Sequence, residues 1–245
     1  MRNFRRLILA GIVTFVLGLI ITFPARVAYQ WFAPADLKLS GISGSIWRGT
    51  ATQGSVGGIY LADLSWSFRP LGLLSGRLEY AARSNLAPGF VDANIGVGVG
   101  GSLAITDVSG SLTLDMLAEV LPLNGITGDV SLQFEQLVVE NGLPVEVRGT
   151  LKIANLVSRY LSPSPLGDYQ ARFETEADGI LGSVDAISGV LDLIGTIKLG
   201  RDRNYEFAGK IAAKSNAPIN ISQQLQLLGS PDADGLRDFR IEGQL

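Results

Sequence analysis

The sequence predicts a mainly β protein, in which one N-terminal transmembrane helix is followed by a long curved antiparallel sheet with a few short helices. Three observations carry this prediction. The chain opens with an uncharged apolar run, it then alternates polar and aliphatic residues over most of its length, and 30 of its 245 residues are glycine. Because hydrophobic residues make up 47% and charged residues only 18%, the composition is not that of a disordered chain.

Histidine and cysteine are both absent from the sequence. Without imidazole or thiolate, the chain has no zinc finger, no haem or iron–sulfur ligation of the common kinds, no Ser-His-Asp or Cys-His catalytic set and no disulfide. Only carboxylate, lysine, tyrosine or hydroxyl chemistry remains for a catalytic role.

The first segment is predicted to anchor the chain in a membrane. Arg2, Arg5 and Arg6 precede the uncharged run from Leu7 to Phe23, whose 17 residues would extend about 26 Å as a helix, and continuation through Ala25 completes a span. The excess of arginine before the run predicts a cytoplasmic stub at residues 1–6, a transmembrane signal anchor at 7–25 and export of the remainder. A cleaved signal peptide is the alternative. It is disfavoured because the run is long and Arg26 stands where a small residue is needed.

The charge differs sharply across this boundary. Residues 1–30 contain four arginines and no acid, whereas residues 31–245 contain 16 basic and 23 acidic residues, a net charge of −7. We therefore expect no nucleic-acid partner, since no basic stripe is present. We expect residues 26–36 to form a linker and residues 37–245 to form an exported β domain.

Strands are predicted by a repeated unit of glycine, one polar residue and one aliphatic residue that opens an alternating run. Alternation places successive side chains on opposite faces of a sheet, and strands at this spacing form an antiparallel meander. Examples of such alternation are Leu64, Trp66 and Phe68; Val91, Ala93, Ile95, Val97 and Val99; and Val130, Leu132 and Phe134.

Three segments break the alternation and are expected to be short helices, namely residues 115–121, 155–161 and 219–228. Each has a candidate capping residue at or near its start, namely Asp115, Asn155, and Asn220 or Ser222, and a proline or glycine after it. Residues 162–167 contain two prolines and are expected to form a loop that marks a sub-division of the β domain. Because the strand pattern is the same on both sides, one continuous sheet is favoured over two domains.

Two patterns match the residue types of a binding or catalytic site. Gly96 to Gly101 matches G-x-G-x-x-G, but strand-like alternation continues through it, whereas a dinucleotide site requires a helix there. Glu174, Glu176 and Asp178 share one face of a strand, which favours a solvated face over the acid and base of a carbohydrate-active enzyme. The sequence therefore predicts no catalytic, metal or cofactor-binding residues, and no cofactor.

A series of short blocks occurs in a fixed order over about 220 residues. They are Phe23-Pro24-Ala25, the segment 37–49 with Gly41, Gly44 and Trp47, the segment 64–70 with Trp66 and Pro70, the segment 121–130, the segment 165–169 with Gly167, Leu227-Leu228-Gly229, and Gly243-Gln244-Leu245. This order resembles the type II secretion system protein N family. The resemblance implies a non-enzymatic, single-pass protein of the bacterial inner membrane. It would support export of folded periplasmic proteins across the outer membrane through contacts with other secretion components, inner-membrane and secretin-associated.

The glycine-rich strands are also similar to the AsmA-like and lipopolysaccharide-transport groups, whose half-open β structures handle lipid. The alternative function is therefore a periplasmic lipid-handling scaffold, with Val91, Ile95, Val97 and Val99 lining an apolar groove and lipid as a further partner. Trp47 and Trp66 are expected to be core anchors within strands. The run from Phe239 to Leu245 is a candidate docking edge only if it is not paired within the chain.

Overall fold

The computed structural model describes residues 2–86, 88–98, 102–117, 125–140 and 142–244, without the side chains of residues 2–6 and 75. Almost all of the described chain after residue 36 is strand. In chain order the elements are α1 (Arg2–Ile21), α2 (Ala25–Phe32), β1 (Leu37–Ser40), β2 (Ser43–Gly44), β3 (Arg48–Val56), β4 (Ile59–Arg69), η1 (Pro70–Ser75), β5 (Arg77–Asn85), β6 (Phe90–Gly98), β7 (Leu103–Thr113), η2 (Leu114–Leu117), β8 (Ile126–Glu140), β9 (Leu143–Ser158), β10 (Ser162–Glu176), β11 (Gly179–Gly189), β12 (Leu191–Gly200), β13 (Asn204–Ala213), α3 (Ile219–Leu225), η3 (Gln226–Leu228) and β14 (Arg237–Gln244), where η denotes a 3₁₀ turn.

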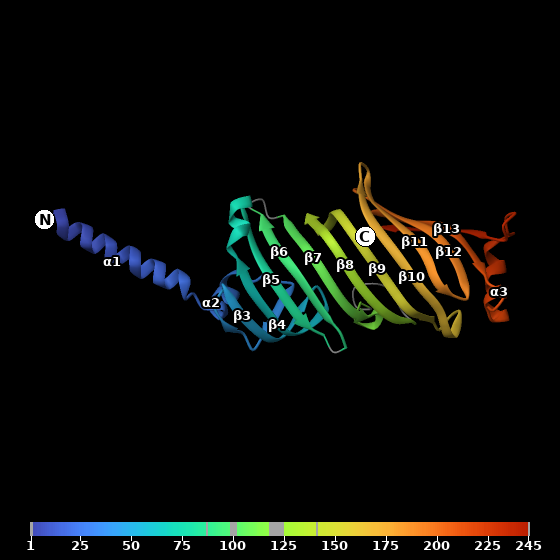
Figure 1. The fold of residues 1–245 in the computed structure, drawn as a ribbon, viewed down its shortest axis with the longest axis horizontal. Helices are drawn as coiled ribbons and strands as arrows, with labels where there is room; N and C mark the ends of the chain where they lie inside the picture. The colour runs from blue at the N-terminus through green and yellow to red at the C-terminus, as the bar shows by residue number, and fades with distance from the viewer. Residues whose placement is uncertain (1, 87, 99–101, 118–124, 141, 245) are drawn as a thin grey trace.

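All the strands belong to one 14-stranded antiparallel sheet. From β3 to β14 each strand pairs with the next one along the chain, and β1 and β2 both pair with β3. Helix α1 projects from one end of the elongated molecule, and α3 lies at the opposite end (Figure 1). The prediction of one long antiparallel sheet with few short helices is confirmed.

Two local predictions were wrong, and both concern the connection between β9 and β10. Residues 155–161 do not form a helix, because β9 continues to Ser158, with Asn155 at a left-handed φ of 53°. Residues 162–167 do not form a loop, because β10 begins at Ser162. The two prolines are tolerated there because the pairing with β9 is irregular between Ser162 and Gly167, so their missing N–H groups are not needed.

Of the other two helix predictions, one is confirmed and one can be compared with the structure only in part. Residues 219–228 form α3 followed by the turn η3, as predicted. Residues 114–117 form the short turn η2, whereas residues 118–121 of the predicted helix lie outside the described part. The segment 26–36, expected as a linker, contains most of α2, which packs on the sheet through the buried Ala25.

The sheet has one apolar face, defined by rows of residues that lie directly opposite each other on neighbouring strands. One row runs across five strands, from Tyr80 through Ile95, Ile105 and Leu137 to Val147. A second row runs through Leu112, Val130, Ile153, Tyr169 and Ala186. Residues one step along each strand point to the opposite face, which carries polar rows such as Gln133, Thr150, Arg172, Ser183 and Thr196.

Buried core residues gather in three clusters that turns and helices cover, whereas much of the apolar face between them is only half-buried. The first cluster lies under η2, the second under α3 and the third under α2. Their buried members are Leu86, Leu112, Leu114 and Val130; Leu166, Leu191, Ile221 and Leu225; and Ala25, Ile42 and Ala51.

Glycines on the apolar face accommodate aromatic rings from neighbouring strands. A Cβ atom at Gly182 would lie 2.7 Å from the ring of Phe173, and one at Gly243 would lie 2.5 Å from that of Tyr205. Gly149 and Phe134, and Gly49 and Trp66, form the same kind of pair. An aromatic ring that covers a glycine on an adjacent strand restores buried area that the glycine lacks and fixes the strand register. The glycine excess therefore serves packing as well as turns.

Candidate functional site

The C-terminal end of α1 is tied to the sheet by Trp47. The sequence predicted that Trp47 lies within a strand, but this residue lies in the bend between β2 and β3. Its Nε1 donates a hydrogen bond of 2.8 Å to the carbonyl of Ile20, and the N–H of Ile46 donates to the carbonyl of Phe23 at 3.0 Å. The last carbonyls of a helix lack the usual partner within it, so the bond to Ile20 satisfies the end of α1, and together with the bond to Phe23 just after the helix it holds this end against the sheet.

Aromatic side chains surround this junction. Trp47 packs edge-on against Phe68 with ring centroids 4.8 Å apart, and Phe68 lies 5.4 Å from Tyr80. Trp66, which does lie in a strand, donates from Nε1 to the carbonyl of Ser45 at 3.2 Å. On α2, Trp31 and Phe32 remain 68% and 76% exposed.

The described side chains of α1 are exposed along the helix, from Leu7 to Ile21. The side chains of Arg2, Arg5 and Arg6 lie outside the described part of the chain. Within the part of the chain that is described, we find no helix with the length and hydropathy that a membrane crossing requires.

The two edges of the sheet differ. At β1, the hydroxyl of Tyr29 accepts a hydrogen bond from the N–H of Leu39 at 3.0 Å and donates to the carbonyl of Leu37 at 3.2 Å, so α2 closes this edge. At the other end of the strand order, β14 pairs with β13 alone, and the described residues place no strand on its outer side. The condition predicted for a docking edge at Phe239 to Leu245, no pairing within the chain, is met on one side only: residues 239–244 pair with β13, and their outer side is open. Leu245 lies outside the described residues.

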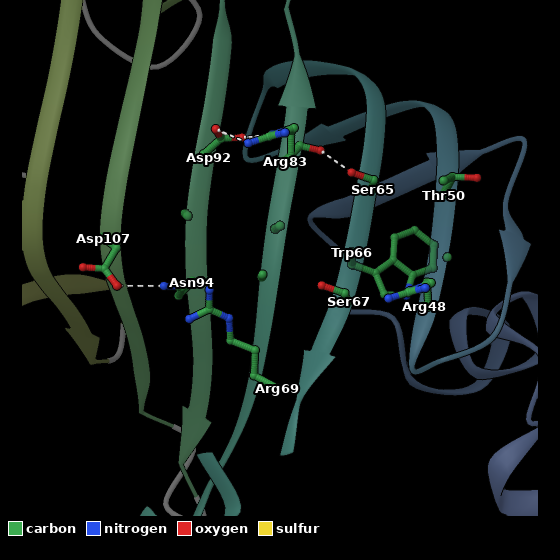
Figure 2. A pocket seen from close by; sticks show the side chains of 14 residues that line it. Arg48, Thr50, Ser65, Trp66, Ser67, Arg69, Arg83, Asp92, Asn94 and Asp107 are labelled. Atoms are coloured by element: carbon green, nitrogen blue, oxygen red, sulfur yellow. Dashed lines mark hydrogen bonds and ion pairs between the residues drawn. The ribbon is translucent and has the colours of Figure 1, made fainter. Parts of the chain in front are cut away.

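A polar hollow of about 640 Å³ lies across β3 to β7 (Figure 2). Arg83 forms a two-pronged ion pair with Asp92, at 2.5 and 2.9 Å, and the buried Asn94 donates to Asp107 at 2.8 Å. The hydrogen bond and charge of Asp92 raise the pKa of Arg83. Both carboxylates that line the hollow, Asp92 and Asp107, already accept hydrogen bonds from its other side chains, so it offers a polar recess.

A second polar group crosses four strands where they bulge. Asp168 accepts from the N–H of Asn155 at 2.9 Å and from the hydroxyl of Ser188 at 2.8 Å, and these bonds lower its pKa. The side chain of Asn155 donates to Asp129 at 3.3 Å. Beside it, burial, with the nearby charge of Asp168, raises the pKa of Tyr169 to about 12. These contacts hold the irregular start of β10 in place.

We expect Tyr169→Phe to reduce the loss of stability at alkaline pH. A tyrosine whose pKa is raised on folding stabilises the fold fully below its ordinary value of about 10 and loses that contribution as the pH rises toward its folded value. Urea titrations of the two chains between about pH 9 and 12 measure this difference. Parallel pH profiles for the two chains would contradict the assignment.

The remaining sequence candidates are dispersed. Glu174, Glu176 and Asp178 are exposed, and Asp178 lies in the turn after β10. In the described chain, no cluster of three or more Asp or Glu side chains that could hold a metal ion is found. Gly96 lies in β6, so the described part of the G-x-G-x-x-G match is strand, whereas residues 99–101 lie outside the described chain.

The proposed groove residues Val91, Ile95 and Val97 share the apolar face, and Val99 lies outside the described residues. The other positions carried by the family resemblance occupy turns, bends and strand ends. Pro24 forms an isolated β-bridge with Ser45, and Pro70 opens η1. A positive φ is found at Gly41, Gly44, Gly167 and Gly229. Gly243 lies under the ring of Tyr205. From the sequence, Tyr29 was expected only in an aromatic belt at the membrane or as a first packing contact, and its hydrogen bonds to β1 were missed. The pairing of glycines with aromatics was also missed, although the alternation of both residue types gives a signal for it.

Taken together, the fold and its surfaces define a helix-tethered, single-layer β scaffold with one apolar face and one open edge. The chain belongs to the family described as Type II secretion system (T2SS), protein N, whose model matches residues 35–240. It is 24% identical over 235 residues to the Type II secretion system protein N of Aeromonas hydrophila and 26% identical over 254 residues to that of Vibrio cholerae serotype O1, with 93% of each chain covered in both cases. No solved structure matches the chain.

Proposed function

We propose that this protein is a single-pass inner-membrane component of the type II secretion system that works without catalysis or cofactor. Its sheet would support export of folded periplasmic proteins across the outer membrane by contacting other secretion components. The family and the names of both relatives support the assignment to this system. The paired charges of the polar hollow support a role in contact and not in chemistry.

The anchor in this proposal is the segment 7–25, with residues 1–6 in the cytoplasm and 37–245 in the periplasm. Its support is the uncharged run, the three arginines before it and the exposure of the described α1 side chains. A reporter that is active only in the periplasm, fused after Asp36, is expected to be active, with the chain uncut. Cleavage near Ala28 would instead identify a signal peptide.

The open edge of β14 is the observation that carries the contact role. An exposed strand edge presents unpaired N–H and C=O groups that accept a strand from another chain. On one face of β14, Phe239 packs on Phe207 with ring centroids 4.9 Å apart, and Ile241 is 55% exposed. On the other face, Arg240 forms ion pairs with Glu206, at 2.8 Å, and with Glu242. A partner strand added at this edge would therefore continue one apolar face and one charged face of β14.

Photo-crosslinking in membranes from the native organism tests this role. A photoreactive residue at Ile241 is expected to capture another component of the secretion system. The same residue at Ile194, which is 63% exposed on the interior strand β12, is the matched control. Equal capture from both positions, or capture of proteins unrelated to secretion from Ile241, would count against docking at this edge.

The continuous apolar face favours one alternative, a periplasmic scaffold that handles lipid. The cross-strand rows make this face apolar over most of the sheet, and Leu78 and Val97 at its margin are 48% and 44% exposed. A hollow of about 400 Å³ near the β9 and β12 ends is lined by the apolar Leu143, Val145 and Leu199, with Glu140, Glu146 and Arg201 among its other lining residues. Sites for apolar ligands are concave and lined mainly by such side chains.

Mass spectrometry of the protein purified from membranes separates the two functions. Bound phospholipid that is lost in Val97→Glu and kept in Ile194→Glu, on the opposite face, would support lipid handling. A lipid content no higher than that of a control membrane protein would remove this alternative and leave the contact role.

A further inference from the structure

The turn η1 exposes an unusual concentration of apolar side chains. Leu71, Leu73 and Leu74 are 77%, 53% and 88% exposed on a turn of six residues, which Pro70 opens and Gly76 ends at a φ of 70°. Leu78 and Val97 lie directly opposite each other on β5 and β6 just beyond the turn, and both are more than two-fifths exposed. We call these five residues the apolar tip. Single exposed aliphatics are ordinary, but a contiguous group indicates a surface that another apolar phase covers.

The position of the apolar tip indicates which phase that is. Figure 1 shows η1 at the same end of the molecule's long axis as the C-terminal end of α1. The hydrogen bond from Trp47 to Ile20 fixes this end of α1 to the sheet, so the tip and the helix end belong to one connected unit. A bilayer crossed by α1 would therefore have its surface at the end of the sheet that carries the tip.

Charge points to the same surface. Arg69 and Arg77 flank the turn; Arg69 lies 3.6 Å from Glu79, and Arg77 is exposed. Residues 26–83 contain six basic and three acidic residues, a net charge of +3, whereas residues 84–245 contain 11 and 20, a net charge of −9. Anionic lipid attracts basic groups close to the membrane surface and repels acidic ones. This distribution of charge favours an orientation in which the N-terminal end of the protein faces an anionic membrane.

We propose that the apolar tip inserts its leucines into the outer leaflet of the bilayer that α1 crosses, with Arg77 at the phosphate level. This inference rests on the proposed anchor and adds a second membrane contact to it. One helix alone leaves the sheet free to rotate about the membrane normal and to tilt. A second contact, beside α1, fixes the tilt of the sheet, and with it the direction in which β14 presents its open edge. Short apolar segments with basic flanks bind the interface in this way, reversibly and with a preference for anionic lipid.

Depth-dependent fluorescence quenching tests the proposal, and the absence of native cysteine makes single labelling sites available. The full chain, with an environment-sensitive dye at Leu74→Cys, is reconstituted into vesicles of phosphatidylethanolamine and phosphatidylglycerol that contain a lipid-attached quencher. The matched control is Leu227→Cys, because Leu227 is 87% exposed on the 3₁₀ turn η3 at the other end of the sheet. Leu17→Cys reports on the anchor itself.

We expect quenching at position 74 to exceed that at position 227 by roughly threefold or more, as for an interfacial segment. Arg77→Glu should roughly halve quenching at position 74 in these vesicles and change it little in vesicles of phosphatidylcholine. Quenching at position 17 without an excess at position 74 would overturn the tip and leave the anchor standing. Absence of quenching at position 17 would overturn the anchor, whatever position 74 shows. An excess at position 74 that persists fully in Arg77→Glu would contradict the role of the arginine.

Discussion

Gly167→Ala is expected to destabilise the protein by about 3–5 kcal/mol, the sum of a strained backbone and an overpacked site. Gly167 has a φ of 138°, a conformation that side chains rarely adopt. A Cβ atom there would overlap the carbonyl oxygen of Ser188 on β11, and this backbone atom cannot move without breaking the pairing of two strands. The segment also contains Leu166, which is buried in the core under α3, so the damage would spread beyond the strand.

A glycine with the same kind of backbone but open surroundings provides the control. Gly57, in the turn between β3 and β4, has a φ of 57° and no atom within 4 Å of an added Cβ. Gly57→Ala should therefore cost only the backbone strain, about 1–2 kcal/mol. Urea titration of the full chain in detergent, followed by tryptophan fluorescence, measures both values. Equal losses for the two variants would show that the overlap with Ser188 is relieved by movement of the strand.

Ile221→Ala is expected to cost about 2–4 kcal/mol, because removing a fully buried aliphatic side chain loses its transfer energy and leaves a cavity. Ile221 has no exposed surface and packs with Leu166, Leu191 and Leu225. This cluster is what holds α3 on the end of the sheet. Apart from it, the described contacts that bind α3 side chains to other elements are two hydrogen bonds, from Asn220 to the carbonyl of Leu161 and from Gln224 to that of Tyr160.

The same helix supplies the control for this substitution. Ile219 is 77% exposed, so Ile219→Ala should change the free energy of unfolding by less than about 0.5 kcal/mol. Limited proteolysis would add a local measurement, with faster cleavage near α3 expected for Ile221→Ala alone. Similar behaviour of the two variants would mean that α3 contributes little to the stability of the sheet.

The strands of the sheet were largely predictable because their signal is local. The alternation around Leu64, Trp66 and Phe68, or around Val130 and Leu132, requires only that successive side chains point to opposite faces. The antiparallel order followed, since strands this close in sequence pair with their neighbours. The short helix at residues 219–228 was equally predictable, because Gly229 directly follows its last apolar residue.

The errors occurred where a contact distant in sequence outweighed a local preference. Residues 155–167 contain an asparagine cap signal and two prolines, yet residues 155–158 lie in β9 and residues 162–167 in β10. Asp168 accepts hydrogen bonds from Asn155 and Ser188 on the two neighbouring strands, and the irregular pairing removes the need for the proline donors. Trp47 was placed in a strand by its neighbours in sequence, but its indole bonds to a carbonyl 27 residues earlier. No local pattern contains such partners.

The sequence by itself determined the strand-forming segments, the acidic character of residues 31–245, the absence of imidazole and thiol chemistry and the family resemblance, because each follows from residue type and short-range spacing. Only the tertiary structure decided which edge of the sheet is closed by Tyr29 and which stays open at β14, and which glycines lie under aromatic rings. It also placed η1 at the same end of the molecule's long axis as the C-terminal end of α1 (Figure 1). These features depend on how distant strands and helices meet, and that geometry is set by the packing of the whole sheet.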